Sequence, residues 1–174
     1  RCSNCGMELT EPVKETTEKS AEVKTTQAAQ GTFSINEIVS NYLTLKNALT
    51  KDDTKGAANA GKALYAIFNS VNPNSIDAKL KTEYLDIADD AKEHAEHIGA
   101  NGGNIEHQRE HFAMLSKDMN DLIKSFKSEQ KLYQDFCPMY DGGKGAIWIS
   151  ETKEIKNPYQ GKKMLTCGSM KKEL

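Results

Sequence analysis

The stretch that decides the fold is residues 104–126, which read NIEHQREHFAMLSKDMNDLIKSF. Apolar residues recur in it every three or four positions, a period that places them on one face of an α-helix. Asn104 precedes the first of them and suits an N-cap, because its side chain can accept a hydrogen bond from a free backbone N–H. We predict a long amphipathic helix whose apolar face needs a partner. That face consists of Ile105, Phe112, Leu115, Met119, Leu122 and Phe126.

Three earlier stretches show the same helical period. The first follows Ser34, which we expect to form a capping box with Glu37. The second restarts at Asp52 or Asp53, and the third opens at Ser75 and ends at a break over residues 99–103. Short connections make neighbouring helices antiparallel, so we predict an up-down bundle of about four helices. The apolar positions of the three stretches are Ile35, Ile38, Val39, Tyr42, Leu45 and Leu49; Ala57, Ala60, Leu64, Ile67, Phe68 and Val71; Leu80, Tyr84, Ile87, Ala91, Ala95 and Ile98.

Beyond residue 131 the pattern changes to short, mixed segments. We expect extended segments at 133–139, 146–150 and 162–165, separated by glycine-rich and proline-containing turns at 141–145 and 157–161. These segments predict a small irregular β lobe packed on the bundle. The expected fold is therefore mainly α.

Composition divides the chain into three regions. Residues 1–10 contain a Cys2-x-x-Cys5 knuckle, residues 11–31 are polar with almost no large apolar residue, and residues 32–174 hold the bundle and the lobe. A polar segment of this kind cannot offset the entropy of ordering, so we interpret residues 11–31 as a linker. The chain opens at Arg1 rather than Met, which favours a trimmed, periplasmic or otherwise exported protein. A membrane anchor in a missing N-terminal segment is an open alternative.

Charge and motif content exclude several function classes. The 174-residue chain has a net charge of −2 with acids and bases interspersed, which argues against nucleic acid or an anionic membrane as the main partner. No apolar run approaches the roughly 20 residues of a membrane-spanning helix, so we expect no transmembrane segment in this chain. Paired carboxylates, a nucleophile elbow and a phosphate loop are all missing from the sequence, and we predict no enzymatic activity.

Two mirrored sulfur motifs carry the clearest chemistry. Cys137-Pro138-Met139 is a Cys-x-Met motif, and Met164 and Cys167 form a Met-x-x-Cys motif. Thiolate and thioether are soft ligands that favour Cu(I). Residues i and i+2 of an extended segment share a face, so Cys137 and Met139 can present sulfur side by side. We predict a Cu(I) site formed by Cys137, Met139, Met164 and Cys167.

Two alternatives to this site remain open. The two methionines can instead fill gaps in the core. The two cysteines, Cys137 and Cys167, can instead form a disulfide that pins the lobe to itself, as in many exported proteins.

All four histidines flank the connection between the third and fourth predicted helices. His94 and His97 close one helix, and His107 and His111 open the next. In an antiparallel hairpin His94 lies opposite His111 and His97 opposite His107, so imidazoles could hold Zn(II) or Cu(II). His94 and His111 lie nearest the apolar stripes and are the better candidates. The alternative is a polar helix end without metal.

Trp148 and Arg109 are interpreted as structural residues. A single tryptophan in a Gly-Ala-x-Trp strand usually anchors the core, although its ring could also cover a soft cation. Arg109 lies beside the apolar stripe, where we expect it to donate hydrogen bonds to the β lobe.

Several motifs also resemble a known family. Residues 104–116 resemble the I-x-x-Q-R-x-x-F-x-x-L-S helix of a bacterial exported domain of unknown function, which stands alone or is attached to Cus-type membrane-fusion adaptors of heavy-metal efflux pumps. The resemblance covers about residues 33–172. Its other motifs are Phe136-Cys137-Pro138-Met139, Gly145-Ala146-Ile147-Trp148, Ile155-Lys156-Asn157-Pro158-Tyr159 and Met164-Leu165-Thr166-Cys167-Gly168.

The N-terminal knuckle resembles the second half of a small heavy-metal-binding module. Ser3 replaces the usual proline, and the module's first Cys-Pro-Met-His segment is missing. The resemblance implies that Cys2 and Cys5 either pass metal to the domain or are a remnant of a longer module.

Residues and resemblance together predict an exported copper-binding protein that sequesters Cu(I) or passes it to an efflux adaptor or pump component. The alternative is a structural or interaction module held by a Cys137–Cys167 disulfide. A thiol oxidoreductase using Cys2 and Cys5 is least favoured, because no βαβ pattern accompanies that motif.

Overall fold

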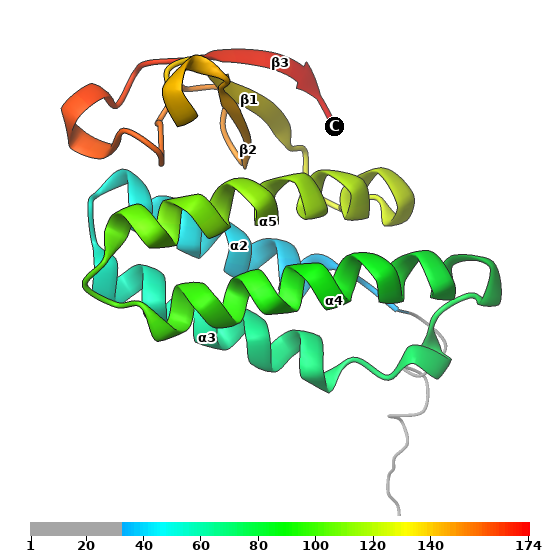
Figure 1. Ribbon diagram of the computed structural model, residues 1–174. Coiled ribbons are helices and arrows are strands. Elements are labelled where there is room, and N and C mark those ends of the chain that lie inside the picture. The colour runs from blue at the N-terminus through cyan, green and yellow to red at the C-terminus, as the bar shows by residue number, and fades with distance from the viewer. Residues whose placement is uncertain (1–32) are drawn as a thin grey trace, which may run out of the picture. The chain divides into compact units, whose positions relative to one another are not determined.

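The computed structural model describes residues 33–174, so the knuckle with Cys2 and Cys5 and the linker lie outside the described residues. Four helices come first: α2 (Asn36–Thr50), α3 (Thr54–Ser70), α4 (Ala78–Ala100) and α5 (Ile105–Phe126). Each helix packs on the next one along the chain. Figure 1 shows them running back and forth, which confirms the predicted up-down bundle. Most positions of the predicted apolar stripes are buried, from Leu45 and Leu64 to Ile98 and Leu115. Six of them are only half-buried: Ile67, Val71, Leu80, Ile87, Ile105 and Phe126.

Two of the predicted helix starts are confirmed by their caps. The Asp53 carboxylate accepts a hydrogen bond from the Gly56 backbone N–H at 2.9 Å, and the Asn104 side chain accepts one from His107 N at 3.2 Å. Both side chains satisfy donors that a helix start leaves free.

The other two predicted starts lie one and two residues before the observed N-caps, Ile35 and Asp77. Helix α2 begins at Asn36, and the Ser34 hydroxyl accepts from Asn36 N in a local turn instead of forming a capping box. Helix α4 begins at Ala78 after Asp77, whose side chain accepts from Lys79 N. A 3₁₀ turn (Pro73–Ser75) occupies the predicted start, because Pro73 favours a tight turn there.

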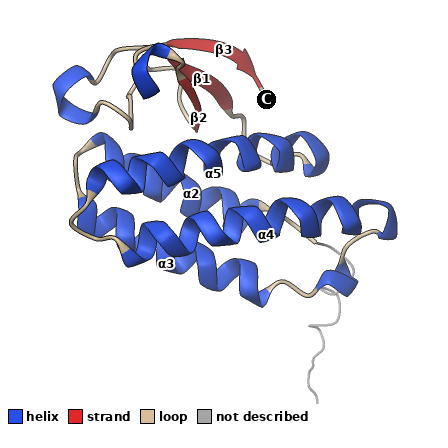
Figure 2. Cartoon of the chain, in the orientation of Figure 1, coloured by secondary structure: helices blue, strands red, loops and turns tan. Residues whose placement is uncertain are grey.

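Three short strands follow the bundle: β1 (Tyr133–Cys137), β2 (Ala146–Ser150) and β3 (Ser169–Glu173). They form an antiparallel sheet in the order β2-β1-β3, coloured red in Figure 2. The extended segment predicted at 162–165 is wrong, because Gly161–Met164 form a 3₁₀ turn. Sequence patterning missed β3, since all of its residues are exposed and no apolar alternation marks it.

The sheet packs on the bundle through β2, which contacts both α5 and α2. Trp148 of β2 is fully buried, which confirms its prediction as a core anchor. Its ring lies beside Gly168, whose backbone has φ of +131°. A Cβ added at Gly168 would lie 2.7 Å from the Phe136 carbonyl oxygen, so this close approach of two chain segments requires glycine.

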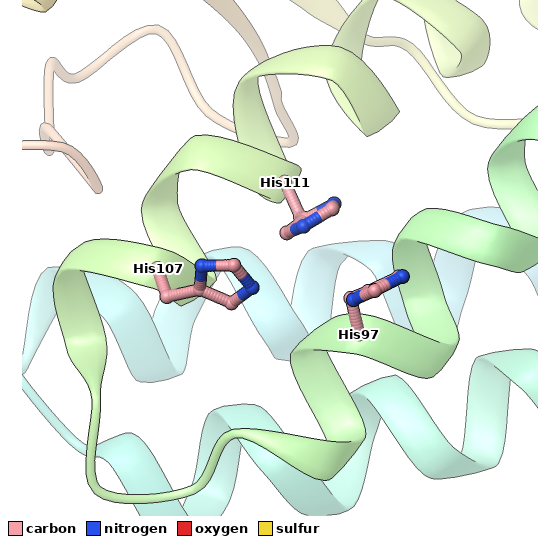
Figure 3. A group of neighbouring side chains, drawn as sticks. All are labelled: His97, His107 and His111. Atoms are coloured by element: carbon pink, nitrogen blue, oxygen red, sulfur yellow. The ribbon is translucent and has the colours of Figure 1, made fainter.

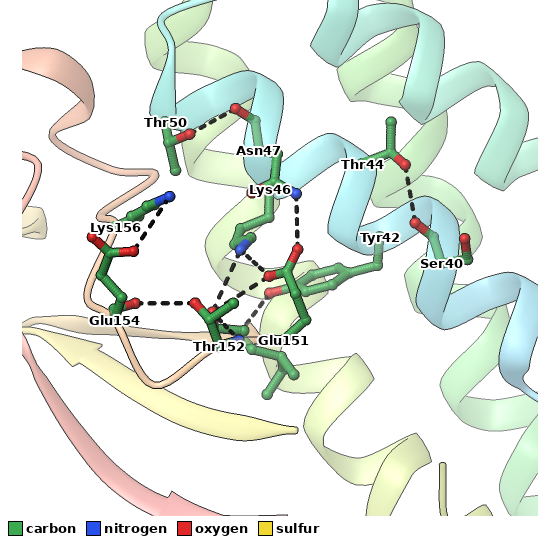
Figure 4. A network of polar contacts seen from close by, with 12 residues as sticks. Ser40, Tyr42, Thr44, Lys46, Asn47, Thr50, Glu151, Thr152, Glu154 and Lys156 are labelled. Atoms are coloured by element: carbon green, nitrogen blue, oxygen red, sulfur yellow. Dashed lines mark hydrogen bonds and ion pairs between the residues drawn. The ribbon is translucent and has the colours of Figure 1, made fainter. Parts of the chain in front are cut away.

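A polar network joins α2 to the end of β2 (Figure 4). The Ile149 backbone N–H donates to the Tyr42 hydroxyl at 3.0 Å, and that hydroxyl also contacts the Ser116 hydroxyl at 2.6 Å. The Lys46 ammonium, almost fully buried, forms an ion pair with Glu151. Burial raises the pKa of Tyr42 far above its usual value, so the phenol is neutral. These contacts fix the lobe on the bundle.

Asp135, in the middle of β1, is a fully buried acid. Neither of its carboxylate oxygens has a hydrogen-bond partner among the described residues. Burial raises its pKa from 3.8 to about 7, and the nearby Lys46 charge opposes that shift. Between those values the folded chain binds more protons than the unfolded chain, so stability should fall as pH rises through this window.

Asp135→Asn should remove this pH dependence, because asparagine resembles the neutral acid. We expect the free energy of unfolding to stay near the wild-type value at pH 4 and to exceed it by roughly 1–3 kcal/mol at pH 8. Urea unfolding at both pH values measures the difference. The exposed Asp86→Asn is the control and should show no such trend; an equal gain at both pH values for Asp135→Asn would contradict the explanation.

Candidate metal centre

The four histidines lie on the facing ends of α4 and α5, as the hairpin predicted. The Nδ1 atoms of His94 and His111 are 3.0 Å apart, and the ring centroids of His97 and His107 are 6.0 Å apart. The tight connection over residues 101–104 turns the chain back on itself, with Gly103 at φ of +102°. The expected opposition of the imidazoles is therefore confirmed.

Three of these imidazoles form a compact cluster, drawn in Figure 3: His97, His107 and His111. Each offers a ring nitrogen, and the three nitrogens all lie within 4.8 Å of one another. His97 stacks on His111 with ring centroids 4.4 Å apart, and His107 meets His111 edge-on at 4.7 Å. Metal–nitrogen bonds of about 2.0–2.1 Å require tetrahedral ligand nitrogens roughly 3.3 Å apart, a spacing that small side-chain rotations would reach.

Of the two histidines that the sequence favoured, only His111 belongs to this cluster. His94 touches His111 from the side and is not one of the three whose nitrogens converge. We call His97, His107 and His111 the imidazole cluster.

The environment favours the neutral form of His111 and of its neighbour His94. Desolvation, followed by the charges of His97, His94 and His107, lowers the pKa of His111 from 6.5 to about 4. The pKa of His94 is also lowered, mainly by desolvation. Only the neutral imidazole can donate a lone pair to a metal, so His111 is in its ligand form at neutral pH.

An open groove of about 660 Å³ runs beside His111, between α5 and the turn at residues 140–146. Three carboxylates line it, those of Glu106, Glu110 and Asp141. Burial, followed by these three charges, raises the pKa of Tyr140 on the groove wall to about 12, so its phenol is neutral. The three carboxylates outnumber the single lysine of the lining, Lys117, so the groove carries a net negative charge that favours the approach of cations.

Glu110 has a second role near the cluster. One of its carboxylate oxygens lies 3.4 Å from Nδ1 of His107. A carboxylate that accepts from one ring nitrogen orients the other nitrogen toward a metal. The i,i+3 spacing from His107 to Glu110 could have revealed this pair from sequence, whereas nothing local indicated that the turn at 140–146 would form the opposite wall of the groove.

The structure brings together the two cysteines of the sulfur motifs. Cys137 is buried at the end of β1, and Cys167 is half-buried in the loop before β3. Both are free thiols. Desolvation raises the pKa of Cys167, and the neighbouring Cys137 side chain adds to this shift.

The two methionines of the predicted sulfur site lie on the surface. Met139 is 56% exposed and Met164 is 40% exposed. Exposure at this level argues against the alternative that they fill gaps in the core. The four-sulfur ligand set stays a prediction.

Comparison with known proteins identifies a family. Residues 38–131 match the family described as "Protein of unknown function (DUF3347)", a match that spans more than half of the chain. No curated protein and no solved structure matches the chain. None of helices α2 to α5 combines the length and apolar composition that a bilayer-spanning segment needs.

Proposed function

The chain belongs to the DUF3347 family, and we propose that it is a non-catalytic metal-binding protein of copper homeostasis. The observation that carries this proposal is the convergence of three imidazole nitrogens within 4.8 Å on one helical hairpin. Imidazole suits zinc and copper, so the cluster would take Zn(II) or Cu(II).

The choice of copper rests on the second set of donors in the same domain. Cys137 and Cys167 are adjacent, and Met139 and Met164 flank them in sequence. Thiolates and thioethers prefer Cu(I) among the biological metals. Imidazoles can bind Cu(II) and soft sulfurs can bind Cu(I), so a domain with both kinds of ligand suits copper in its two oxidation states.

Accessibility favours transfer over permanent storage. His97 is exposed, the other two cluster residues are half-buried, and both thioethers are exposed. Ligands at a surface can exchange with those of a partner, so the protein would sequester copper and pass it on. We propose an efflux adaptor or pump component as the recipient and an exported, periplasmic location, both on the strength of the resemblance to adaptor-linked domains.

A second candidate is a structural or interaction module. It is favoured by the contact between Cys137 and Cys167, since two adjacent thiols can close a disulfide that holds the lobe.

Anaerobic Cu(I) titration against a competing chelator tests the sulfur site. The titration uses the full chain with Cys2→Ser and Cys5→Ser, so that only the two lobe thiols contribute. Adding Cys137→Ser and Cys167→Ser should abolish tight Cu(I) binding, because the softest ligands are lost. Met139→Leu or Met164→Leu should each weaken binding by at least about tenfold, or roughly 1.4 kcal/mol.

Met170 offers a matched control for the thioethers, since it is 42% exposed and lies outside the predicted set. Met170→Leu should leave Cu(I) affinity unchanged. Unaltered binding after loss of both cysteines would refute copper binding at this lobe, and equal effects of all three methionine variants would refute the thioether ligands.

A further inference from the structure

We propose that Cys137 and Cys167 form a redox-active dithiol that exchanges with small-molecule disulfides, in which Cys167 attacks and Cys137 resolves. This activity goes beyond metal binding and involves none of the imidazole cluster. A redox-active dithiol also differs from a permanent structural disulfide. Its two thiols have separate roles, and its disulfide bond forms and breaks by exchange.

Strand pairing brings the backbone of Cys137 beside the segment that carries Cys167. In the β1–β3 register Phe136 pairs with Ser169, so continuing the antiparallel ladder puts Cys137 opposite Gly168, next to Cys167. The missing side chain at Gly168 lets the two segments approach closely. The Cys137 side chain then lies near enough to the Cys167 thiol to raise the pKa of that thiol.

The two thiols differ in their access to solvent. Cys137 is completely buried beneath the sheet, and Cys167 is only partly covered. A dissolved disulfide can reach Cys167 but not Cys137. In thiol–disulfide exchange an accessible thiol can form the mixed disulfide, and a neighbouring thiol can then displace the leaving group.

Asn157 holds the segment that carries Cys167 in place. Its side-chain amide donates to the Cys167 carbonyl at 2.7 Å, and its backbone N–H donates to the Leu165 carbonyl at 2.7 Å. Its side-chain oxygen accepts from the backbone N–H groups of Tyr159 and Gln160 at 2.7 and 3.0 Å. Asn157 is itself fully buried, so this clamp limits the motion of the Cys167 backbone beside β1 and raises the effective concentration of the two thiols toward each other.

The exchange can be written with glutathione disulfide as the oxidant. The Cys167 thiol loses its proton to solvent, and its thiolate attacks one sulfur of the oxidant, which breaks the S–S bond and releases one glutathione thiolate. The Cys137 thiol then loses its proton and attacks the Cys167 sulfur, which releases the second glutathione. The two thiols lose two electrons in total, and the oxidant is reduced to two molecules of glutathione.

The test again uses the full chain with Cys2→Ser and Cys5→Ser, in the presence of a metal chelator. The protein is mixed with glutathione disulfide, quenched with acid and analysed by mass spectrometry over time. We expect this parent protein to lose two hydrogen atoms without accumulating an adduct. Adding Cys137→Ser should trap glutathione on Cys167, whereas adding Cys167→Ser should leave a protein that reacts at least about tenfold more slowly, as a buried thiol does.

Differential alkylation of the same parent protein, without further substitution, provides a second measurement that does not depend on the folding of the variants. Brief treatment with iodoacetamide followed by peptide mapping should label Cys167 well before Cys137. A stable glutathione adduct on the parent, or equal reactivity of the two thiols in either measurement, would overturn the proposal. Since the histidines are unchanged throughout, neither result bears on metal binding at the imidazole cluster.

Discussion

His111→Ala should remove metal binding from the imidazole cluster and weaken the affinity for Zn(II) or Cu(II) by at least about 100-fold, or roughly 2.8 kcal/mol. His111 is the central member, since its ring contacts those of His94, His97 and His107. Its loss leaves two nitrogens on different helices, which cannot enclose an ion. The loss of affinity should be large because His97 and His107 alone supply only two of the three ligand nitrogens.

His94→Ala is the matched control for this experiment. His94 contacts the ring of His111 but does not converge with the other nitrogens, so its loss should weaken the affinity by no more than about tenfold, or roughly 1.4 kcal/mol. Imidazole NMR signals report the binding at each ring and separate this site from the cysteines. Equal losses of metal affinity in His94→Ala and His111→Ala would instead indicate that the metal binds to the His94–His111 pair. If added metal still shifted the NMR signals of His97 and His107 in His111→Ala, the proposed three-histidine site would be contradicted.

Arg109→Met should destabilise the domain by roughly 3 kcal/mol, because it leaves buried acceptors without a donor. The buried guanidinium donates to the Leu49 carbonyl at 2.9 Å, to the Asp52 carboxylate at 2.7 Å and to the Pro158 carbonyl at 2.7 Å. It thereby joins the end of α2 to the loop of the β lobe, which confirms the predicted structural role of Arg109. Its hydrogen bond also lowers the pKa of Asp52.

Urea unfolding at pH 7 measures this loss, and a surface ion pair supplies the comparison. Lys131 lies 3.6 Å from Glu173 with both side chains exposed, so Lys131→Met should change stability by less than about 0.5 kcal/mol. Similar effects of the two substitutions would mean that Arg109 contributes only as a surface charge. Because Pro158 and Asn157 are adjacent, the Arg109 variant should also loosen the segment that carries Cys167.

The gathering of the histidines was predictable because it depends on local geometry. Residues four apart on a helix share a face, and a short connection places the next helix antiparallel to it. Those two facts bring His107 and His111 to His97 without any information on the rest of the fold. The same reasoning could not rank His97 above His94, because the difference lies in ring orientations that are set by packing between α4 and α5.

The groove and the thiol pair depend on contacts between distant segments. The wall formed by Tyr140 and Asp141 reaches α5 only because the sheet docks on the bundle, through buried residues such as Trp148 and Tyr42. Cys137 and Cys167 meet because β3 pairs with β1, and β3 carries no apolar pattern from which its position could be inferred.

The sequence by itself determined the four helices, their antiparallel order and the gathering of the imidazoles. Each of these follows from hydrophobic period, capping and short connections, which act over a few residues. Only the tertiary structure decided that the two cysteines lie on neighbouring segments while the two methionines face solvent, and that one thiol is buried and the other partly accessible. Burial and strand pairing are properties of the whole domain, because they depend on which surfaces the other segments cover.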